Sequence, residues 1–331
     1  MLTDISVVVP VYRSEDCLPA LEAAVDTAMR QAGFSYELLL IDDASPDRSW
    51  AAIKELAQKN PAVKGLRHRR NFGQDNAIMT GLRQAIGAAV VIMDDDLQHA
   101  PEDIPRLHAE MLRSGADVVY AHFHQRRQAY WKTLGSWFNG KVAEWLLDKP
   151  AHIYLSPFKI IRHEIAELVS VFDGPYPYFD SLAFQVTDRF SSIAAEHHER
   201  LAGASTYTFL KSLQVWARLA FSFSVKPLRL VTWMGGVAFA IGSIGATLII
   251  IQRLMWSIQP VGWASLMVTV LVLAGTQMLA LGVLGEYIGR THINVHRRPQ
   301  AIIAETVAVE HLNAAGPDLP TSCAWPNSAQ S

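Results

Sequence analysis

The chain has little cysteine, no excess of basic charge and no secretory signal, and each absence excludes a class of protein. Its two cysteines, Cys17 and Cys323, are too few and too far apart for a disulfide framework or a zinc site. The formal net charge is -2, whereas a nucleic-acid binder usually carries a large basic excess, so we expect no nucleic-acid partner. The first apolar run, Ile5–Val9, ends at Pro10 and is shorter than a signal-peptide core. We therefore expect this part of the chain to stay in a reducing cytoplasm.

Residues 1–120 alternate short apolar runs with segments of helical periodicity. Strands that alternate with helices predict an α/β fold with a mostly parallel sheet, covered by helices on both faces. The expected strands are Ile5–Val9, Leu38–Ile41, Ala88–Met93 and Val118–Tyr120, and the expected helices are residues 16–32, 47–59 and 101–113. Ligands bind such sheets beyond the carboxyl ends of the strands. Two of the runs end in acidic clusters, Asp42-Asp43 and Asp94-Asp95-Asp96.

Two later segments, residues 230–251 and 264–285, contain no charged residue. A helix over either one would reach about 33 Å at about 1.5 Å per residue, enough for a hydrocarbon core of about 30 Å. Trp233, Trp256 and Trp263 stand near the ends, as interfacial anchors do. We therefore predict a transmembrane hairpin with spans at about 230–253 and 263–286, and a pair of buried helices is the alternative.

Basic residues flank this hairpin and predict its orientation. Both outer flanks are basic, whereas the connection holds only Arg253, so the positive-inside rule places both termini in the cytoplasm. The resulting domains are residues 1–207 (catalytic), 208–229 (juxtamembrane amphipathic helix), 230–290 (hairpin) and 291–331 (cytoplasmic tail with a disordered end). Residues 130–147 are a second amphipathic candidate, either interfacial or packed on the sheet. Glycines in the spans suit packing within the hairpin or in a homo-oligomer.

The segment after Ala88–Met93 carries the clearest chemical signal. Carboxylate and amide oxygens are hard ligands suited to Mg²⁺ or Mn²⁺ with phosphate oxygens. In an extended segment, residues i and i+2 point the same way. Asp94, Asp96 and Gln98 would then face one ion, with Asp95 turned away. A solvated acidic turn is the alternative that the cluster alone leaves open.

Several motifs in order along the chain resemble family-2 glycosyltransferases. The later ones are similar to the polyprenyl-phosphate glycosyltransferase, or dolichyl-phosphate-mannose-synthase-like, branch of that family. The resemblance covers about residues 3–299. The motifs are Val7–Tyr12 with Glu15, Leu40–Asp47, Arg70-Asn71-Phe72-Gly73, Asp94–His99, His197–Tyr207, Phe223–Arg229 and Gly285–Arg290.

The resemblance implies a GT-A fold, inverting transfer, and Mg²⁺ or Mn²⁺ as cofactor. For the base and ribose it implies the residues Pro10, Tyr12, Glu15, Asp42 and Asp43, and it adds Asn71 and Asp95 to the substrate site. For the metal and diphosphate it implies Asp94, Asp96 and Gln98. It also implies that Arg200 and Ser205 lie in a loop that closes over phosphates. Two departures stand out. Arg13 occupies a position where Asn is usual, and Tyr154–Lys159 replaces a Gly-Asp-Phe-Arg pattern.

The expected function is transfer of a sugar from a nucleotide-sugar, with UDP favoured, to undecaprenyl or another polyprenyl phosphate at the cytoplasmic face of a bacterial membrane, for cell-envelope glycan or lipid modification. An acceptor phosphate, with a second pKa of roughly 6, is already ionised. It needs positioning by arginines such as Arg126, Arg127 and Arg200 more than a base. For Arg126 and Arg127 a solvated basic loop is the alternative. Asp96 as base is the less favoured alternative to metal binding. The alternative functions are a processive polysaccharide synthase and a non-catalytic nucleotide-sugar-binding protein.

Overall fold

The computed structural model describes residues 3–123, 153–174, 176–195, 226–256, 262–295 and 299–309. The chain divides into two compact units. One comprises Met1–Phe138, Lys149–Ala204 and Arg297–Ser331, and the other comprises Asn139–Asp148 and Ser205–His296. The amphipathic segment predicted at 130–147 lies outside the described residues, as do residues 208–225 of the one predicted at 208–229 and the end of the predicted tail. Residues 226–229 are described, and they belong to a long helix rather than to a separate juxtamembrane one.

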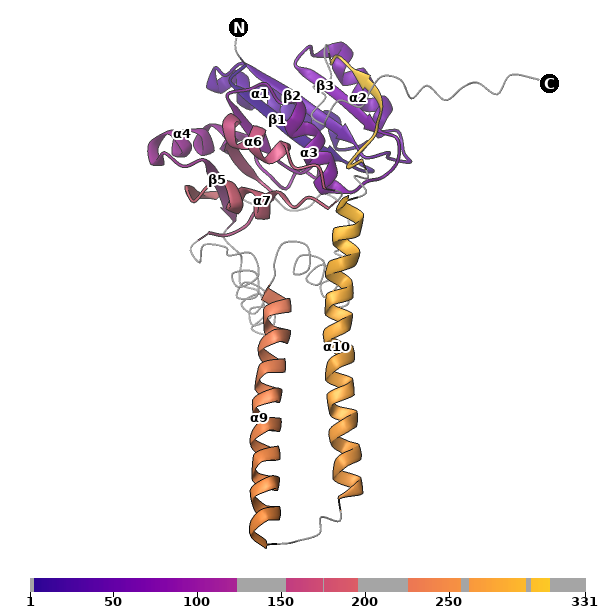
Figure 1. The fold of residues 1–331 in the computed structure, drawn as a ribbon. Helices are drawn as coiled ribbons and strands as arrows, with labels where there is room; N and C mark the ends of the chain where they lie inside the picture. Colours follow the sequence, from indigo (N-terminus) through magenta and orange to yellow (C-terminus); the bar gives the residue numbers. More distant parts are fainter. Residues whose placement is uncertain are drawn as a thin grey trace, which may run out of the picture. The chain divides into compact units, whose positions relative to one another are not determined.

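The first unit is an α/β domain in which strands and helices alternate (Figure 1). The four strands and three helices predicted within residues 1–120 are confirmed, with small shifts at their ends. In chain order the elements are β1 (Ile5–Val11), α1 (Leu18–Ala32), β2 (Tyr36–Asp42), α2 (Ser49–Lys59), β3 (Val63–His68), α3 (Gln74–Gln84), β4 (Ala89–Ile92), η1 (Pro101–Asp103), α4 (Ile104–Ser114), β5 (Val118–Phe123), β6 (Lys159–Arg162), α6 (His163–Ser170), α7 (Phe179–Val186), β7 (Phe190–Ala195) and β8 (Ile303–Val307).

These strands form one mixed sheet in the order β7-β5-β6-β4-β1-β2-β3-β8. The β1, β2, β3 and β4 strands are parallel to one another, and β7 is parallel to β5. Strand β6 runs antiparallel to β4 and β5, and β8 runs antiparallel to β3. The sheet is therefore mostly parallel, as predicted, with antiparallel strands added at two places.

Helices cover both faces of the sheet. Every residue of β1 is buried, which explains why the strand reads as a continuous apolar run rather than an alternating one. On one face, Val7 and Leu40 join a core cluster with Leu21 of α1 and with residues of α2 and α4. On the other face, α3 packs so closely on β1 that a Cβ on Gly81 would clash with Val8.

The parallel strands bring the chemistry-bearing segments to one edge. In the register, Pro10 of β1 lies opposite Ile41 of β2, and Val8 lies opposite Ile92 of β4. The residues that follow these three strands therefore leave the sheet side by side at its carboxyl edge. Both acidic clusters predicted from the sequence lie on these segments.

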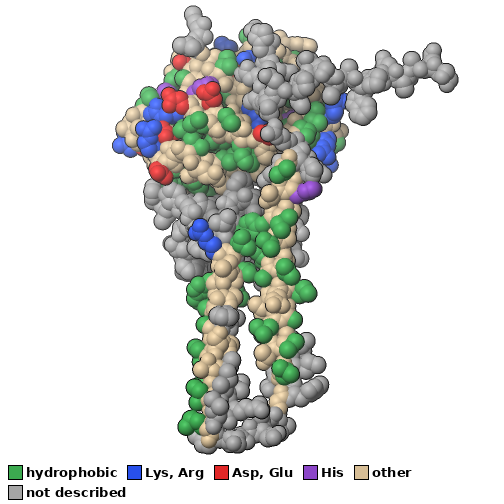
Figure 2. All heavy atoms as spheres, viewed as in Figure 1, with side chains coloured by type: hydrophobic (Ala, Val, Ile, Leu, Met, Phe, Trp, Pro, Cys, Tyr) green, Lys and Arg blue, Asp and Glu red, His purple; other side chains and the backbone are tan. Residues whose placement is uncertain are grey.

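The second unit contains two long helices, α9 (Lys226–Trp256) and α10 (Trp263–Val295). Within the described residues, one segment, Val272–Gly289, is long and apolar enough to cross a membrane, with a mean hydropathy of 1.3 and none of it buried. In α9, Val231–Gly245 is a shorter apolar stretch. Figure 2 shows hydrophobic side chains exposed along both helices. The structure thus confirms helices at both predicted spans, and it leaves the membrane hairpin as a prediction.

Strand β8 is a feature that the sequence pattern did not predict. Residues 291–331 were expected to form a tail, but Ile303–Val307 add a strand to the sheet beside β3. Val307 packs against the same core cluster as α1 and α2. The first unit is therefore completed by residues that follow α10 in the chain.

Candidate active site

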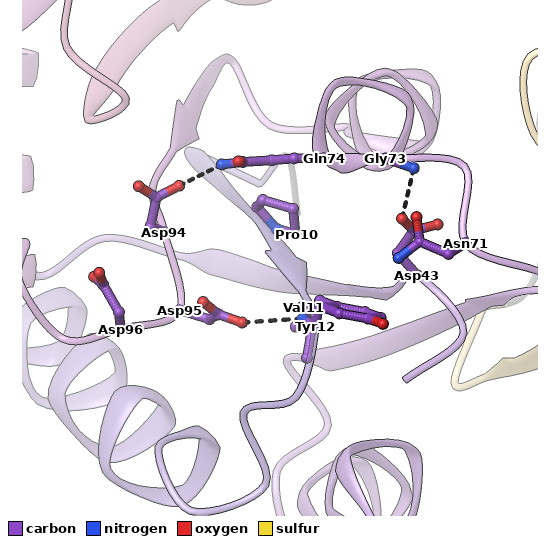
Figure 3. Close-up of a pocket in the computed structure, with 10 residues that line it drawn as sticks. All are labelled: Pro10, Val11, Tyr12, Asp43, Asn71, Gly73, Gln74, Asp94, Asp95 and Asp96. Atoms are coloured by element: carbon purple, nitrogen blue, oxygen red, sulfur yellow. Dashed lines mark hydrogen bonds between the residues drawn. The ribbon is translucent and has the colours of Figure 1, made fainter. Parts of the chain in front are cut away.

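A cavity of about 330 Å³ opens at the carboxyl edge of the sheet. Its volume is at the lower end of the range for ligand pockets, roughly 300–1,000 Å³. Figure 3 shows its lining side chains, which come from the end of β1, from the segments after β1, β2, β3 and β4, and from the start of α3. They are Pro10, Val11, Tyr12, Asp43, Asn71, Gly73, Gln74, Asp94, Asp95 and Asp96.

The segment after β1 presents an aromatic ring at the cavity. The Tyr12 side chain is 45% exposed, and the Arg13 guanidinium lies 5.4 Å from the ring centroid. Arg13 has a φ of 60°, and its N–H donates to Ser45 Oγ at 3.2 Å. Asn tolerates this left-handed conformation better than most residues. The backbone here therefore gives a physical reason for the Asn that is usual at this position in the family that the motifs resemble.

Asp43 is a buried carboxylate held by the backbone on the other side of the cavity. Its two oxygens accept hydrogen bonds from the Phe72 N–H at 2.8 Å and the Gly73 N–H at 2.7 Å, and Nδ1 of His68 lies 2.8 Å away. Burial alone would raise the pKa of Asp43, but these hydrogen bonds outweigh it and hold the pKa below its usual value. Asp43 therefore stays ionised while it orders the loop that carries Asn71.

The acidic cluster after β4 holds three carboxylates with different partners. Asp94 accepts a hydrogen bond from Gln74 Nε2 at 2.7 Å. Asp95 accepts from the Tyr12 N–H at 3.2 Å and from the Ser14 hydroxyl. Asp96 accepts from the backbone N–H of Gln98 at 3.2 Å. Asp95 is thus directed toward the β1 segment, as Figure 3 shows.

Burial and repulsion between neighbouring carboxylates shift the pKa values in this cluster. Burial raises the pKa of Asp94 to about 7, and repulsion from Asp96 and Asp95 adds to the shift. Attraction to Lys159 and the Gln74 hydrogen bond oppose it. Burial also raises the pKa of Asp95, against its hydrogen bonds from Ser14 and Tyr12. A bound cation would relieve the repulsion among these groups.

The carboxylates of this cluster suit a divalent cation whose coordination is completed by phosphate oxygens of a substrate. Within the described ranges, no three His, Cys, Asp or Glu side chains are grouped as a metal cluster. Mg²⁺ in proteins is usually bound through one or two carboxylates together with substrate phosphates. Asp94 and Asp96 fit that arrangement, because both line the cavity and Asp95 is engaged elsewhere.

Three predicted site residues lie outside the cavity lining. Gln98 contributes its backbone N–H to Asp96. Glu15 accepts a hydrogen bond from the backbone N–H of Arg48 at 2.7 Å, beside the start of α2. Asp42 is fully buried, accepts from the Ser45 N–H at 3.0 Å, and has a pKa raised by burial.

Four further predicted residues, Arg126, Arg127, Arg200 and Ser205, fall outside the described residues. Conversely, Val11, Gly73 and Gln74 line the cavity although they were not candidates. Gly73 has a φ of 96°, which explains the glycine that ends the Arg70–Gly73 motif. That motif was the available signal for Gly73 and its neighbour Gln74.

A buried ion pair lies within electrostatic reach of the acidic cluster. Lys159 of β6 pairs with Asp180 at the start of α7, and both side chains are buried. The Tyr120 hydroxyl donates to the same Asp180 oxygen at 2.9 Å. Lys159 attracts the negative form of Asp94, as the pKa of Asp94 records. The segment Tyr154–Lys159, which departs from the pattern of the family that the motifs resemble, thus ends in the buried side chain of Lys159.

Comparison with known proteins identifies relatives along nearly the whole chain. The family model described as glycosyl transferase family 2 matches residues 6–178. The undecaprenyl-phosphate 4-deoxy-4-formamido-L-arabinose transferase of Proteus mirabilis is 33% identical over 318 residues, covering 94% of this chain and 96% of that protein. An uncharacterised glycosyltransferase of Synechocystis is 28% identical over 94% of this chain and 98% of its own length.

Solved structures are more distant. Glucosyl-3-phosphoglycerate synthase from Mycobacterium tuberculosis, in complex with Mn²⁺, UDP-glucose and phosphoglyceric acid, is 17% identical, with a TM-score of 0.48. That match covers 68% of this chain and 79% of the synthase chain. A structure of TarS from S. aureus is 18% identical, with a TM-score of 0.42 over 59% of each chain.

Proposed function

Because this chain belongs to glycosyl transferase family 2, we propose that it transfers a sugar from a nucleotide-sugar to undecaprenyl phosphate or another polyprenyl phosphate. The choice of acceptor rests on the extent of the similarity to undecaprenyl-phosphate transferases. The similarity covers 94% of this chain, and the remaining residues are fewer than those of either long helix. The similarity therefore includes the two long helices as well as the α/β domain.

The cavity supplies groups for both ends of a nucleoside diphosphate. Tyr12 offers an exposed ring, and Asp43 and Asn71 offer polar groups for a nucleoside, with a UDP-sugar the favoured donor. Asp94 and Asp96, with Gln98, are assigned to a divalent cation beside the diphosphate. Such a cation, when bound, neutralises charge that develops on the leaving nucleoside diphosphate. The protein itself contributes the Asp94 and Asp96 carboxylates, which line the cavity where this cation would bind.

The proposed reaction is a single displacement that inverts the anomeric carbon. An oxygen of the acceptor phosphate forms a bond to that carbon as the bond to the nucleoside diphosphate breaks. The phosphate is already ionised near neutral pH, with a second pKa of roughly 6, so no side chain has to remove a proton. Arg126, Arg127 and Arg200, with Ser205, are assigned to phosphate binding because a guanidinium can hold phosphate through two hydrogen bonds.

The two long helices are assigned to membrane anchorage. Exposing a polyprenyl chain to water costs about 0.8 kcal/mol per CH₂, so the enzyme has to meet its acceptor at the bilayer. We assign α9 and α10 to a transmembrane hairpin with both termini in the cytoplasm, because the flanks are basic and both segments contain a long uncharged run.

The test is a transfer assay on the full chain in detergent. Undecaprenyl phosphate would be incubated with a panel of nucleotide-sugars, beginning with a donor of 4-deoxy-4-formamido-L-arabinose, in Mn²⁺, Mg²⁺ or EDTA. We expect a lipid-linked sugar that forms only with metal, and loss of turnover in Asp96→Asn. Asp16→Asn, which changes an exposed carboxylate outside the cavity lining, is the matched control. A long polymer would support a processive synthase, and folded protein that makes no product from any donor would contradict the proposal.

A further inference from the structure

Strand β8 is built into the edge of the sheet. Figure 1 shows it as the yellow strand beside β3. Its pairing places Glu305 opposite Arg67 and Val307 opposite Gly65. A Cβ on Gly65 would lie 2.7 Å from Val307 Cγ1, so only glycine leaves room for Val307 to pack there. The strand therefore has a specific docking site rather than a loose contact.

The side chain of Glu305 is fixed by two donors on the domain. Its Oε2 accepts a hydrogen bond from Trp50 Nε1 at 2.8 Å, and its Oε1 accepts from Arg67 Nη1 at 3.3 Å. The same Arg67 side chain also contacts Asp42, with Arg67 Nε 3.2 Å from Asp42 Oδ2. Glu305 thus holds the guanidinium that pairs with a completely buried carboxylate.

Asp42 connects Arg67 to the loops that line the cavity. Its Oδ1 accepts the N–H of Ser45, and Ser45 Oγ accepts the N–H of Arg13. Asp42 is followed directly by Asp43, and Arg13 is preceded directly by Tyr12, and both neighbours line the cavity. One chain of polar contacts therefore runs from β8 to two lining segments.

The residues just before β8 support two further lining segments. The carbonyl of Ile302 accepts the N–H of Arg69 at 2.8 Å, two residues before Asn71. Gln300 is buried and accepts a hydrogen bond from Arg83 Nη2 at 2.6 Å. Arg83 lies in α3, the helix whose first residue, Gln74, bonds Asp94.

We propose that residues 299–309 form a structural part of the donor-nucleotide site, with Glu305 and Gln300 acting as positioning residues. This inference rests on the proposed function, because it takes the cavity to bind the donor nucleotide. None of these residues lines the cavity. They act by fixing the backbone that carries Tyr12, Asp43 and Asn71, so they set how well those groups are placed before the nucleotide arrives.

The experiment compares nucleotide binding and turnover in the full chain. UDP and GDP would be titrated by calorimetry into wild type, Glu305→Ala, Glu305→Gln and the control Thr306→Ala, an exposed residue of the same strand. We expect Glu305→Ala to weaken nucleotide binding by about fivefold. It should raise the donor KM to match, with kcat at saturating donor unchanged. Glu305→Gln should keep most of the affinity, because an amide oxygen still accepts from Trp50.

Two outcomes separate this inference from the proposed function. If wild type binds UDP or GDP and Glu305→Ala binds it equally well, residues 299–309 do not position the site, even if the variant melts at a lower temperature. If wild type binds neither nucleotide, the proposed function fails, and this inference fails with it.

Discussion

The raised pKa of Asp94 predicts how metal binding depends on pH. A carboxylate must be ionised to bind a cation. With a pKa of about 7, the ionised fraction of Asp94 is about nine-tenths at pH 8 and about one-tenth at pH 6. We therefore expect the affinity for Mn²⁺ to fall about tenfold from pH 8 to pH 6. Each ion bound at pH 6 should release close to one proton.

The assay measures Mn²⁺ alone, because a nucleotide would add its own titrating phosphate. Free Mn²⁺ would be followed by electron paramagnetic resonance across this pH range. Proton release would come from calorimetry in two buffers of different ionisation enthalpy. Asp94→Asn should flatten the dependence and weaken binding at every pH, and Asp16→Asn should retain the wild-type slope. A wild-type affinity that is constant between pH 6 and pH 8 would refute the reasoning.

The same shift predicts a stability trend in metal-free protein. The pKa of Asp94 is raised by folding, so between about pH 4 and pH 7 the folded state binds more protons than the unfolded state. Its contribution to stability is therefore present at low pH and is lost as the pH rises through this window. Saturating Mn²⁺ should offset the loss near pH 7, because the ion binds the folded state.

Three other substitutions test the packing around the site. Asp43→Asn should destabilise the nucleotide-free chain by about 2–4 kcal/mol, because the amide cannot accept both backbone N–H bonds; thermal melting against Asp16→Asn would measure this. Lys159→Met should cost about 3–5 kcal/mol by leaving the buried Asp180 carboxylate without its counter-charge, and adding Asp180→Asn should restore part of it in chemical denaturation. Gly81→Ala should cost about 1–3 kcal/mol by crowding β1, and an unchanged melting temperature would contradict the close packing of α3.

The centre of the fold was predictable because its signals are local. Strands β1, β2 and β4 are apolar runs buried on both sides, and each leads into a polar segment that the parallel register places at one edge. Six predicted residues line one cavity for this reason: Pro10, Tyr12, Asp43, Asp94, Asp95 and Asp96. The seventh, Asn71, follows β3 and was indicated by the Arg70–Gly73 motif instead.

The rest depended on contacts between distant residues. Strand β3 contains the half-buried residues Lys64 and Arg67 among its buried ones, so no apolar run marks it. The roles of Glu15 and Asp42 depend on which backbone N–H group each meets, at Arg48 and Ser45. Periodicity and composition carry no information about such partners, and neither do single motifs.

The position of β8 in the chain also sets an order of events during synthesis. Strand β3 ends about 235 residues before β8 begins, so its edge stays unpaired on the ribosome while the two long helices are made. At about 5–20 residues per second, this interval lasts between about 10 and 50 s. An open strand edge is a template for wrong pairing. The newborn domain is therefore exposed to aggregation until β8 emerges, and chaperone demand should be greatest just before that point.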